Sequence, residues 1–320
     1  MTNPLLKIND LKTYFHTYNG IVKAVDGVTF ELGKGQTLGI VGESGCGKSV
    51  TSRSILRLIE SPGKIESGSI HYKDSNLLTL SESEMNSIRG KEISLIFQDP
   101  LTSLNPVMKV GDQISEAIGL HFDMSKQETQ EKAKKMLDLV GIPSSEERYY
   151  DYPFTFSGGM RQRLVIASAL SCDPSILIAD EPTTNLDVTT QAQILDLLSD
   201  LKSRLGMSII LITHNLGVVA WLCEYVAVMY AGRIVEYGPV KEIFKNPQHP
   251  YTSALMECLI TSDTSSQVDS IPGMIPDLIN PPSGCRFHPR CNHAFDRCLS
   301  DDPRLFTYDK KRDYACWLKE

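Results

Sequence analysis

The segment 42–49 constrains the fold of this chain more than any other part of the sequence. It reads GESGCGKS and fits the pattern G-x-x-x-x-G-K-[ST]. An apolar run, 36–41, predicts a buried strand before it, and residues 48–59 predict a helix after it. Glycines allow the backbone N–H groups of such a loop to turn toward phosphate oxygens, and the helix adds the positive end of its dipole. The segment therefore predicts a strand, a phosphate-binding loop and a helix in succession.

Two side chains of this loop have a defined chemistry, Lys48 and Ser49. We expect Lys48 to pair with the β- and γ-phosphates of ATP and the Ser49 hydroxyl to be a ligand of Mg²⁺. The backbone of the loop and the first turn of the helix supply the other contacts. The remaining residues of this predicted ATP site are Gly42, Glu43, Ser44, Gly45, Cys46, Gly47 and Val50.

A second apolar run, 176–179, ends in two acids, Asp180 and Glu181. We expect Asp180 to hold Mg²⁺ through water and Glu181 to polarise the water that attacks the γ-phosphate. Two acids after a strand can also be an ordinary solvated strand end. The phosphate-binding loop upstream favours the catalytic interpretation, so the sequence predicts ATP hydrolysis.

Strand-like apolar runs alternate with helix-like segments from residue 5 to about residue 258. This alternation predicts an α/β fold of the P-loop type, with a mainly parallel sheet covered by helices. The later strands are predicted at 92–97, 175–179 and 207–213, and the helices between them at 126–140, 158–170 and 188–205. Three early segments predict an antiparallel patch at one edge of the fold: 8–15, 24–32 and 69–73.

The chain divides, by its composition, into a nucleotide-binding domain, 1–258, and a C-terminal extension, 259–320. A helical subdomain at about 99–170 interrupts the strands of the first domain, because residues 117–151 have mostly helical spacing. Ser, Asp, Thr and Pro are frequent in 261–282, which predicts a linker before the extension.

The bulk composition excludes several classes of protein. The hydrophobic content of 41% and the charged content of 22% are those of an ordinary globular protein. A net charge of −7 argues against a broad nucleic-acid-binding surface, so no nucleic-acid partner is expected. No apolar run reaches the roughly 18–20 residues that span a bilayer, and residues 1–10 lack the pattern of a secretory signal. We therefore expect an intracellular protein unless a partner holds it at a membrane.

The segment 156–163, FSGGMRQR, identifies a family. It resembles the signature of the ABC transporter ATPases, and it precedes Asp180 and Glu181 at the spacing of that family. Ser157, Gly158 and Gly159 at a helix start form a further anion site of the kind found at helix N-termini. The resemblance implies that these three residues bind the γ-phosphate of an ATP held by the opposite subunit of a head-to-tail dimer.

Four more positions of this chain match functional positions of the family. The resemblance implies that Gln98 touches Mg²⁺ or water, that His214 contacts the γ-phosphate and that Asp187 lies at the dimer seam. It also implies that Phe15 stacks on adenine, with Tyr14 and Tyr18 as nearby alternatives. The chain departs from the usual family residues at Cys46, Asn185 and Asn215, none of which removes a catalytic group.

Two further segments, 97–106 and 246–252, resemble the subfamily that powers oligopeptide, dipeptide and nickel uptake, and its D-type ATPase subunits in particular. The resemblance implies a paralogous ATPase subunit or a second copy as dimer partner, two transmembrane permease subunits and an external substrate-binding protein. It places the chain at the cytoplasmic face of the cell membrane. Peptides are the favoured substrate. The alternatives are a nickel or metal-chelate importer, a soluble ABC ATPase and a non-catalytic module of the same fold.

Four of the eight cysteines, Cys285, Cys291, Cys298 and Cys316, crowd into the end of the chain. Without a secretory signal this crowding favours a metal over disulfides. The spacing lacks the close pairs of structural zinc sites and is not that of ferredoxins. The run 284–291, GCRFHPRC, resembles the C-terminal extension of the peptide-importer ATPases, which implies a structural [4Fe–4S] cluster. Zinc, free thiols and disulfides are the alternatives.

Overall fold

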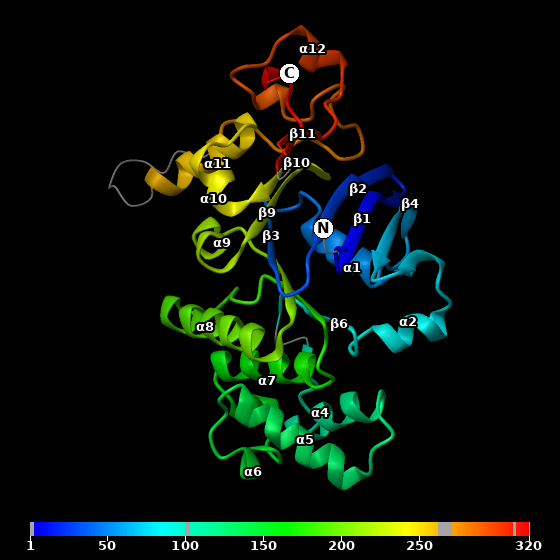
Figure 1. Cartoon of the computed structure of the whole chain (residues 1–320), viewed down its shortest axis with the longest axis vertical. Helices are drawn as coiled ribbons and strands as arrows, with labels where there is room; N and C mark the ends of the chain where they lie inside the picture. Colours follow the sequence, from blue (N-terminus) through cyan, green and yellow to red (C-terminus); the bar gives the residue numbers. More distant parts are fainter. Residues whose placement is uncertain (1–2, 100–102, 262–270, 310–311, 320) are drawn as a thin grey trace. The chain divides into compact units, whose positions relative to one another are not determined.

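The computed structural model describes residues 3–99, 103–261, 271–309 and 312–319. The chain forms two compact units, one of Met1–Thr79 with Leu211–Glu320 and one of Leu80–Ile210. Residues 100–102 of the segment 97–106, and residues 262–270 of the predicted linker, lie outside the described residues. The predicted α/β fold is confirmed (Figure 1).

The first unit contains an antiparallel sheet at the predicted edge. Its strands lie in the order β2 (Gly20–Leu32), β1 (Leu6–Thr17), β4 (Gly63–Tyr72) and β5 (Ser75–Asn76). Every neighbouring pair in this sheet is antiparallel. Alternating apolar residues of β1, such as Leu6 and Ile8, are fully buried, as the pleat of a sheet with one covered face requires.

The same unit contains the strand that leads into the phosphate-binding loop. This strand, β3 (Thr37–Val41), is buried along its whole length and pairs in parallel with β9 (Tyr225–Tyr230). Antiparallel strands continue from β9 in the order β10 (Arg233–Pro239), β12 (Arg312–Tyr314) and β11 (Phe306–Asp309). Because β12 pairs with β10, the C-terminal extension is built onto the sheet of this unit and does not form a separate core.

Short helices complete the first unit. They are α1 (Lys48–Ile55), α9 (Leu216–Leu222), α10 (Val240–Lys245), α11 (Pro250–Thr261) and α12 (Asp296–Ser300), with 3₁₀ turns at Leu77–Thr79, His288–Arg290 and Trp317–Lys319. The predicted helix 48–59 ends early, at Ile55. Arg57 adopts a left-handed φ of 54°, which a continuing helix cannot contain.

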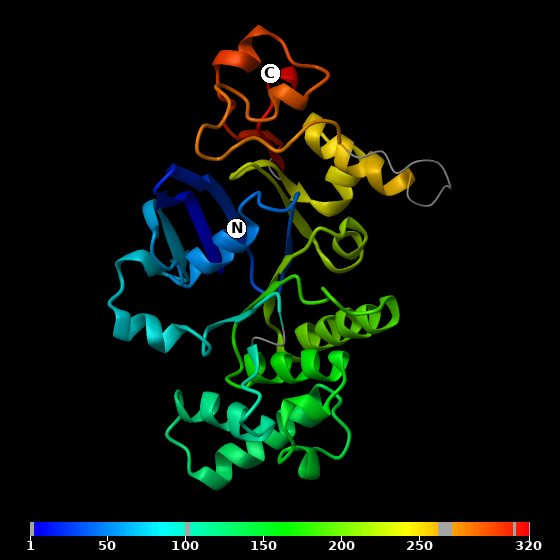
Figure 2. The same cartoon turned by 180° about the vertical axis from the view of Figure 1, so that it is seen from behind.

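The second unit contains parallel strands and most of the long helices. β7 (Ile176–Asp180) and β6 (Ile93–Ile96) are parallel neighbours. β8 (Ser208–Ile212) is next to β7 in the strand order, and the division between the two units falls within it. The helices, which Figure 2 shows from behind, are α2 (Glu82–Ile88), α4 (Val110–Gly119), α5 (Lys126–Leu139), α6 (Ser145–Arg148), α7 (Gly158–Leu170) and α8 (Val188–Leu205), with a 3₁₀ turn at Pro153–Thr155. Helix α7 packs against α4, α5, α8 and β6. It is therefore the central helix of this unit.

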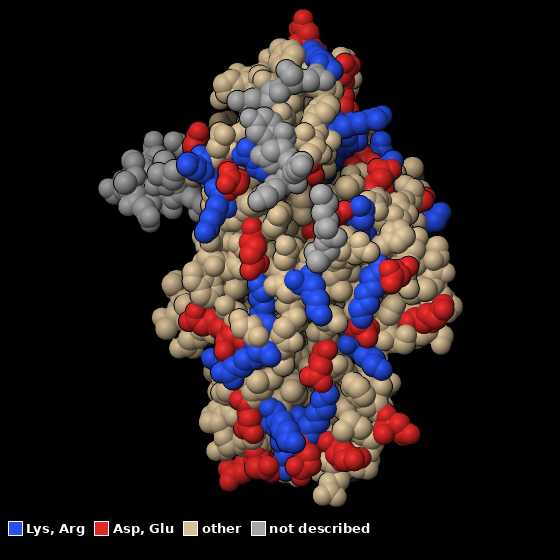
Figure 3. Space-filling view, in the orientation of Figure 1, with Lys and Arg blue, Asp and Glu red and all other residues tan. Residues whose placement is uncertain are grey.

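Lysine, arginine, aspartate and glutamate side chains are interspersed on the face of the molecule that Figure 3 shows. Across the described part of the chain, no helix combines the length and the apolar character that crossing a bilayer requires.

A buried carboxylate organises the start of helix α11. Glu236 of β10 is 1% exposed, and burial raises the pKa of its carboxyl group. Its two oxygens accept hydrogen bonds from the backbone N–H groups of Gln248, at 2.9 Å, and His249, at 3.1 Å. The first N–H groups of a helix have no partner within the helix, so this carboxylate satisfies donors that would otherwise be buried alone.

Replacing Glu236 by leucine should therefore destabilise the first unit. The change leaves two buried N–H donors without an acceptor, and each costs about 1–3 kcal/mol. The free energy of unfolding, measured by denaturant titration, should fall accordingly. The exposed Glu242→Leu in α10 is the matched control and should stay within about 0.5 kcal/mol of the parent protein. Equal stability of the two variants would contradict this role of Glu236.

Candidate active site

The phosphate-binding loop joins β3 to α1, as the sequence predicts, and two of its glycines are required by its packing. Gly42 has φ 153° and Gly47 has φ 107°. A Cβ atom on Gly42 would overlap the carbonyl oxygen of Met229, and one on Gly47 would overlap that of Ala24. The loop thus lies directly against the backbones of β9 and β2, and a larger residue at either position would displace it.

Lys48 begins helix α1 and is 6% exposed. Its Nζ donates to the carbonyl oxygens of Gly42, at 2.8 Å, and Glu43, at 3.0 Å. The ammonium group of Lys48 therefore binds the first two residues of the loop, and the side chain spans the loop. Ser49 and Val50 are half-buried, whereas Ser44 and Gly45 at the tip are exposed.

Cys46 is directed into the protein. Its side chain is 1% exposed, and burial raises the pKa of its thiol. The cysteine at this position therefore fills interior space behind the loop and offers no polar group at its exposed tip.

The three aromatic residues proposed for adenine differ in their surroundings. Tyr14 donates a hydrogen bond from its hydroxyl to Asp26 Oδ1 at 2.6 Å, so its polar end is already occupied. Tyr18 is fully exposed. Phe15 is half-buried in β1 beside Gly63 of β4, which leaves part of its ring accessible for stacking. His214, which also belongs to the first unit, is exposed just beyond the end of β8.

In the second unit, Glu181 follows Asp180 at the end of β7 and adopts a left-handed φ of 48°. One of its carboxylate oxygens accepts hydrogen bonds from Gln98 Nε2, at 2.9 Å, and Thr184 Oγ1, at 3.0 Å. Asp180 is buried at the end of the strand. The structure thus brings the predicted residues Gln98 and Glu181 together and adds Thr184, which sequence analysis missed.

Ser157 is the N-cap of α7, and its hydroxyl accepts a hydrogen bond from the backbone N–H of Met160. Asp187 is the N-cap of α8 and accepts bonds from the backbone N–H and the hydroxyl of Thr190, at 2.9 and 2.7 Å. The hydrogen bond from the Thr190 side chain lowers the pKa of Asp187. A Cβ atom on Gly159 would meet Thr190 Cγ2, so the starts of the two helices lie side by side. Gly158 and Ser157 are exposed there.

The four cysteines of the C-terminal extension line one small cavity, together with His249, His288 and His293. Burial raises the pKa of Cys285 to about 11 and also raises the pKa values of Cys291 and Cys316. Among the residues that the structure describes, no group of three or more His, Cys, Asp or Glu side chains is arranged to hold a metal ion. The cluster therefore stays a prediction.

Two residues that the sequence did not predict also contact the phosphate-binding loop. The Tyr251 hydroxyl accepts a hydrogen bond from the backbone N–H of Glu43 at 3.0 Å, and Arg290 forms an ion pair with the Glu43 carboxylate. Both residues lie in segments, 246–252 and 284–291, that the sequence marked only by resemblance. A resemblance flags such segments, but it does not say which residue of the loop they contact.

Gly47→Ala should abolish nucleotide binding, because its Cβ would displace the loop from Ala24 in β2. The dissociation constant for MgATP, measured by equilibrium titration of the full chain, should rise beyond the measurable range. Gly119→Ala in α4 is the control, since a Cβ there meets no atom within 4 Å. A Gly47→Ala variant that binds MgATP like the parent would refute the packing argument.

Comparisons with known proteins place this geometry in context. The family model for ABC transporters matches residues 25–184, and the model for the oligopeptide/dipeptide transporter C-terminal region matches residues 235–298. The oligopeptide transport ATP-binding protein OppD of Bacillus subtilis is 51% identical over 98% of this chain and 88% of its own length. The dipeptide transport ATP-binding protein DppD of Lactococcus lactis subsp. cremoris is 51% identical over 98% of this chain and 90% of its own length.

Solved structures resemble the fold as well. The ATP-binding cassette MJ0796, in a dimeric post-hydrolysis state bound to ADP and Pi, matches with a TM-score of 0.66 and 25% identity. That match covers 73% of this chain and 98% of the cassette. The cbiO1 protein of Clostridium perfringens, part of the ABC transporter complex cbiONQ, also matches with a TM-score of 0.66 and 25% identity, over 82% of this chain and 96% of its own.

Proposed function

The chain belongs to the ABC transporter family, as an ATP-hydrolysing subunit of a peptide importer, and we propose that Glu181 is the residue that activates water for hydrolysis. One observation carries this proposal. Gln98 and Thr184 donate to the same oxygen of Glu181, which fixes the direction of the carboxylate just beyond Asp180. A general base must be oriented in this way to accept a proton from an attacking water.

The other residues of the site supply binding and electrostatic stabilisation. The backbone N–H groups of the loop 42–47 and the ammonium of Lys48 bind the phosphates. Ser49, Gln98 and Asp180 carry the oxygen ligands that Mg²⁺ prefers, and they would hold it. The bound ion would neutralise charge that develops on the γ-phosphate. His214 contacts the γ-phosphate, and Phe15 stacks on the adenine.

The second half of each site comes from a partner subunit. Ser157, Gly158 and Gly159 lie at the N-terminus of α7, where unpaired N–H groups and the helix dipole favour an anion. Their exposure supports a role in binding the γ-phosphate of ATP held by another subunit, with Asp187 at the seam. The partner is a paralogous ATPase subunit or a second copy of this chain.

We place the dimer at the cytoplasmic face of the cell membrane, beneath two transmembrane permease subunits that an external binding protein supplies with peptide. The relatives OppD and DppD are oligopeptide and dipeptide transport proteins, which supports peptides over nickel or metal chelates as the substrate. Closure of the dimer on ATP and its reopening after hydrolysis would drive the permease subunits.

Glu181→Gln should bind MgATP with near-normal affinity and hydrolyse it about 10²–10⁴-fold more slowly, because the amide cannot accept the proton of water. Phosphate release at saturating MgATP, measured on the chain with its transporter partners, checks this. Glu60→Gln, at an exposed position outside the site, is the matched control and should leave turnover unchanged. Near-normal turnover in Glu181→Gln would remove Glu181 from the proposed role.

We further propose that Cys285, Cys291, Cys298 and Cys316 hold a [4Fe–4S] cluster with a structural role. The donor set of four thiols suits such a cluster, and the shared cavity supports their acting together. Anaerobically purified protein should be brown, with about four iron atoms per chain. Cys298→Ser should lose the iron, whereas Cys172→Ser, a buried thiol of the second unit, should keep it. Colourless protein with stoichiometric zinc would refute the cluster.

A further inference from the structure

Every polar group of Glu43, the second residue of the phosphate-binding loop, has a hydrogen-bond partner. Its backbone N–H donates to the Tyr251 hydroxyl, and its carbonyl oxygen accepts from Lys48 Nζ. Its carboxylate accepts two parallel hydrogen bonds from Arg290, with Nη1 at 2.8 Å from Oε2 and Nη2 at 3.0 Å from Oε1. Glu43 is therefore fixed to α11 and to the C-terminal extension.

Arg290 is positioned for this contact by the extension itself. Its side chain is 3% exposed, although it carries a full charge. Its Nε donates to the carbonyl oxygen of Pro272 and its Nη2 to that of Ile271, and the guanidinium also donates to the Tyr230 hydroxyl. Because these hydrogen bonds already fix the guanidinium, it loses little further conformational entropy when it binds a carboxylate in a bidentate manner.

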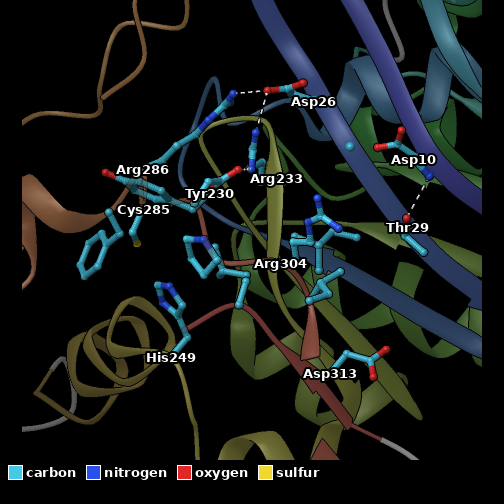
Figure 4. Close-up of a pocket in the computed structure, with 18 of the residues that line it drawn as sticks. Asp10, Asp26, Thr29, Tyr230, Arg233, His249, Cys285, Arg286, Arg304 and Asp313 are labelled. Atoms are coloured by element: carbon cyan, nitrogen blue, oxygen red, sulfur yellow. Dashed lines mark hydrogen bonds and ion pairs between the residues drawn. The ribbon is translucent and has the colours of Figure 1, made fainter. Parts of the chain in front are cut away.

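A second arginine of the same run, Arg286, contacts β2, the strand against which the loop packs. Arg286 forms a buried ion pair with Asp26 of β2, which also binds Arg233 at 3.1 Å (Figure 4). Asp26 accepts a further hydrogen bond from the Tyr14 hydroxyl. Arg286 also donates to the carbonyl oxygen of Ala231. Asp26 lies two residues beyond Ala24, whose carbonyl oxygen lies against Gly47. The run 284–291 thus holds the loop and the strand on which the loop rests.

The charge of Glu43 matters for the ligand of this loop. A carboxylate beside a triphosphate repels it, and the repulsion is stronger at a partly buried site than in water. The bidentate ion pair with Arg290 offsets this charge and binds the carboxylate to the extension. Without Arg290, the same loop would present an unpaired negative charge next to its anion-binding N–H groups.

We propose that Arg290 is a positioning residue of the nucleotide site, through which the C-terminal extension sets the affinity of the phosphate-binding loop for MgATP. This inference rests on the proposed function of the loop. Arg290 does not touch the nucleotide; it acts by neutralising and orienting Glu43. The extension is therefore part of the nucleotide-binding machinery as well as a structural appendage.

The test compares Arg290→Gln, Glu43→Gln and the double variant of the full-length chain, with a fluorescent ATP analogue and Mg²⁺ in an equilibrium titration. Arg290→Gln should weaken binding on the order of tenfold, because it leaves the Glu43 carboxylate unpaired. The double variant should bind like Glu43→Gln alone and more tightly than Arg290→Gln, because Arg290 is needed only while the Glu43 carboxylate is charged. A double variant as weak as Arg290→Gln would overturn the proposal.

Arg297→Gln is the control for general damage to the extension. Arg297 stacks on Trp317 and pairs with Asp301 within the extension. Its replacement should leave the affinity for the ATP analogue unchanged, and an equal loss in this variant would overturn the specific role of Arg290. Arg290→Lys should lie between the parent and Arg290→Gln, because an ammonium cannot reproduce the bidentate contact.

A second measurement separates positioning from catalysis. In the assembled transporter, Arg290→Gln should raise the KM for MgATP on the order of tenfold and change kcat by less than about threefold, because only binding depends on the loop charge. A loss confined to kcat would overturn the proposal. If the parent chain bound no MgATP, the proposed function itself would fail. If the parent bound it and Arg290→Gln bound equally well, only the role of Arg290 would fail.

Discussion

The active site of the first unit depends on contact between main chains. Gly42 and Gly47 lie so close to the carbonyl oxygens of Met229 and Ala24 that no side chain fits. Met229 belongs to β9 and Ala24 to β2, so strands from both sheets of this unit must be in place before the loop can take its shape. The position of the anion-binding N–H groups is therefore determined by sheet packing, and Lys48 then closes the loop across its own carbonyl oxygens.

Three carboxylates, two of them buried and one partly buried, hold this part of the unit together. Asp26, Glu43 and Glu236 each receive several hydrogen bonds, from arginines or from backbone N–H groups. For Asp26, burial alone would raise the pKa, but the Tyr14 hydroxyl, Arg286 and Arg233 hold the pKa below its usual value. Breaking one partner of such a group costs much more than an exposed ion pair. The ion pairs of Asp26 with Arg286 and of Glu43 with Arg290 explain how an extension that forms no separate core is fixed to the ATPase, in addition to the pairing of β12 with β10.

The local pattern of the sequence predicted the helices and strands well, but it did not predict the contacts between distant residues. Helices α7 and α8 begin and end where the sequence predicts, because an N-cap residue and an amphipathic period define each of them. The resemblance to the family implied that Gln98 touches Mg²⁺ or water, whereas its hydrogen bond to Glu181 comes from the structure. The Arg290–Glu43 pair joins residues that are 247 positions apart, and no period or spacing says which arginine meets which acid. Thr184 was missed for a related reason, since its role depends on the left-handed turn at Glu181.

A chain with a net charge of −7 must still bind a polyanion, and the arrangement of charges around the loop explains how. Overall charge governs solubility and long-range steering, whereas a phosphate responds to the groups within a few ångströms. Two acids of the first unit, Glu43 in the loop and Asp26 in β2, are paired with arginines of the extension, Arg290 and Arg286. Lys48, the backbone N–H groups and the start of α1 contribute positive potential at the loop. Under the proposed role of Arg290, local pairing of this kind lets an acidic chain bind ATP.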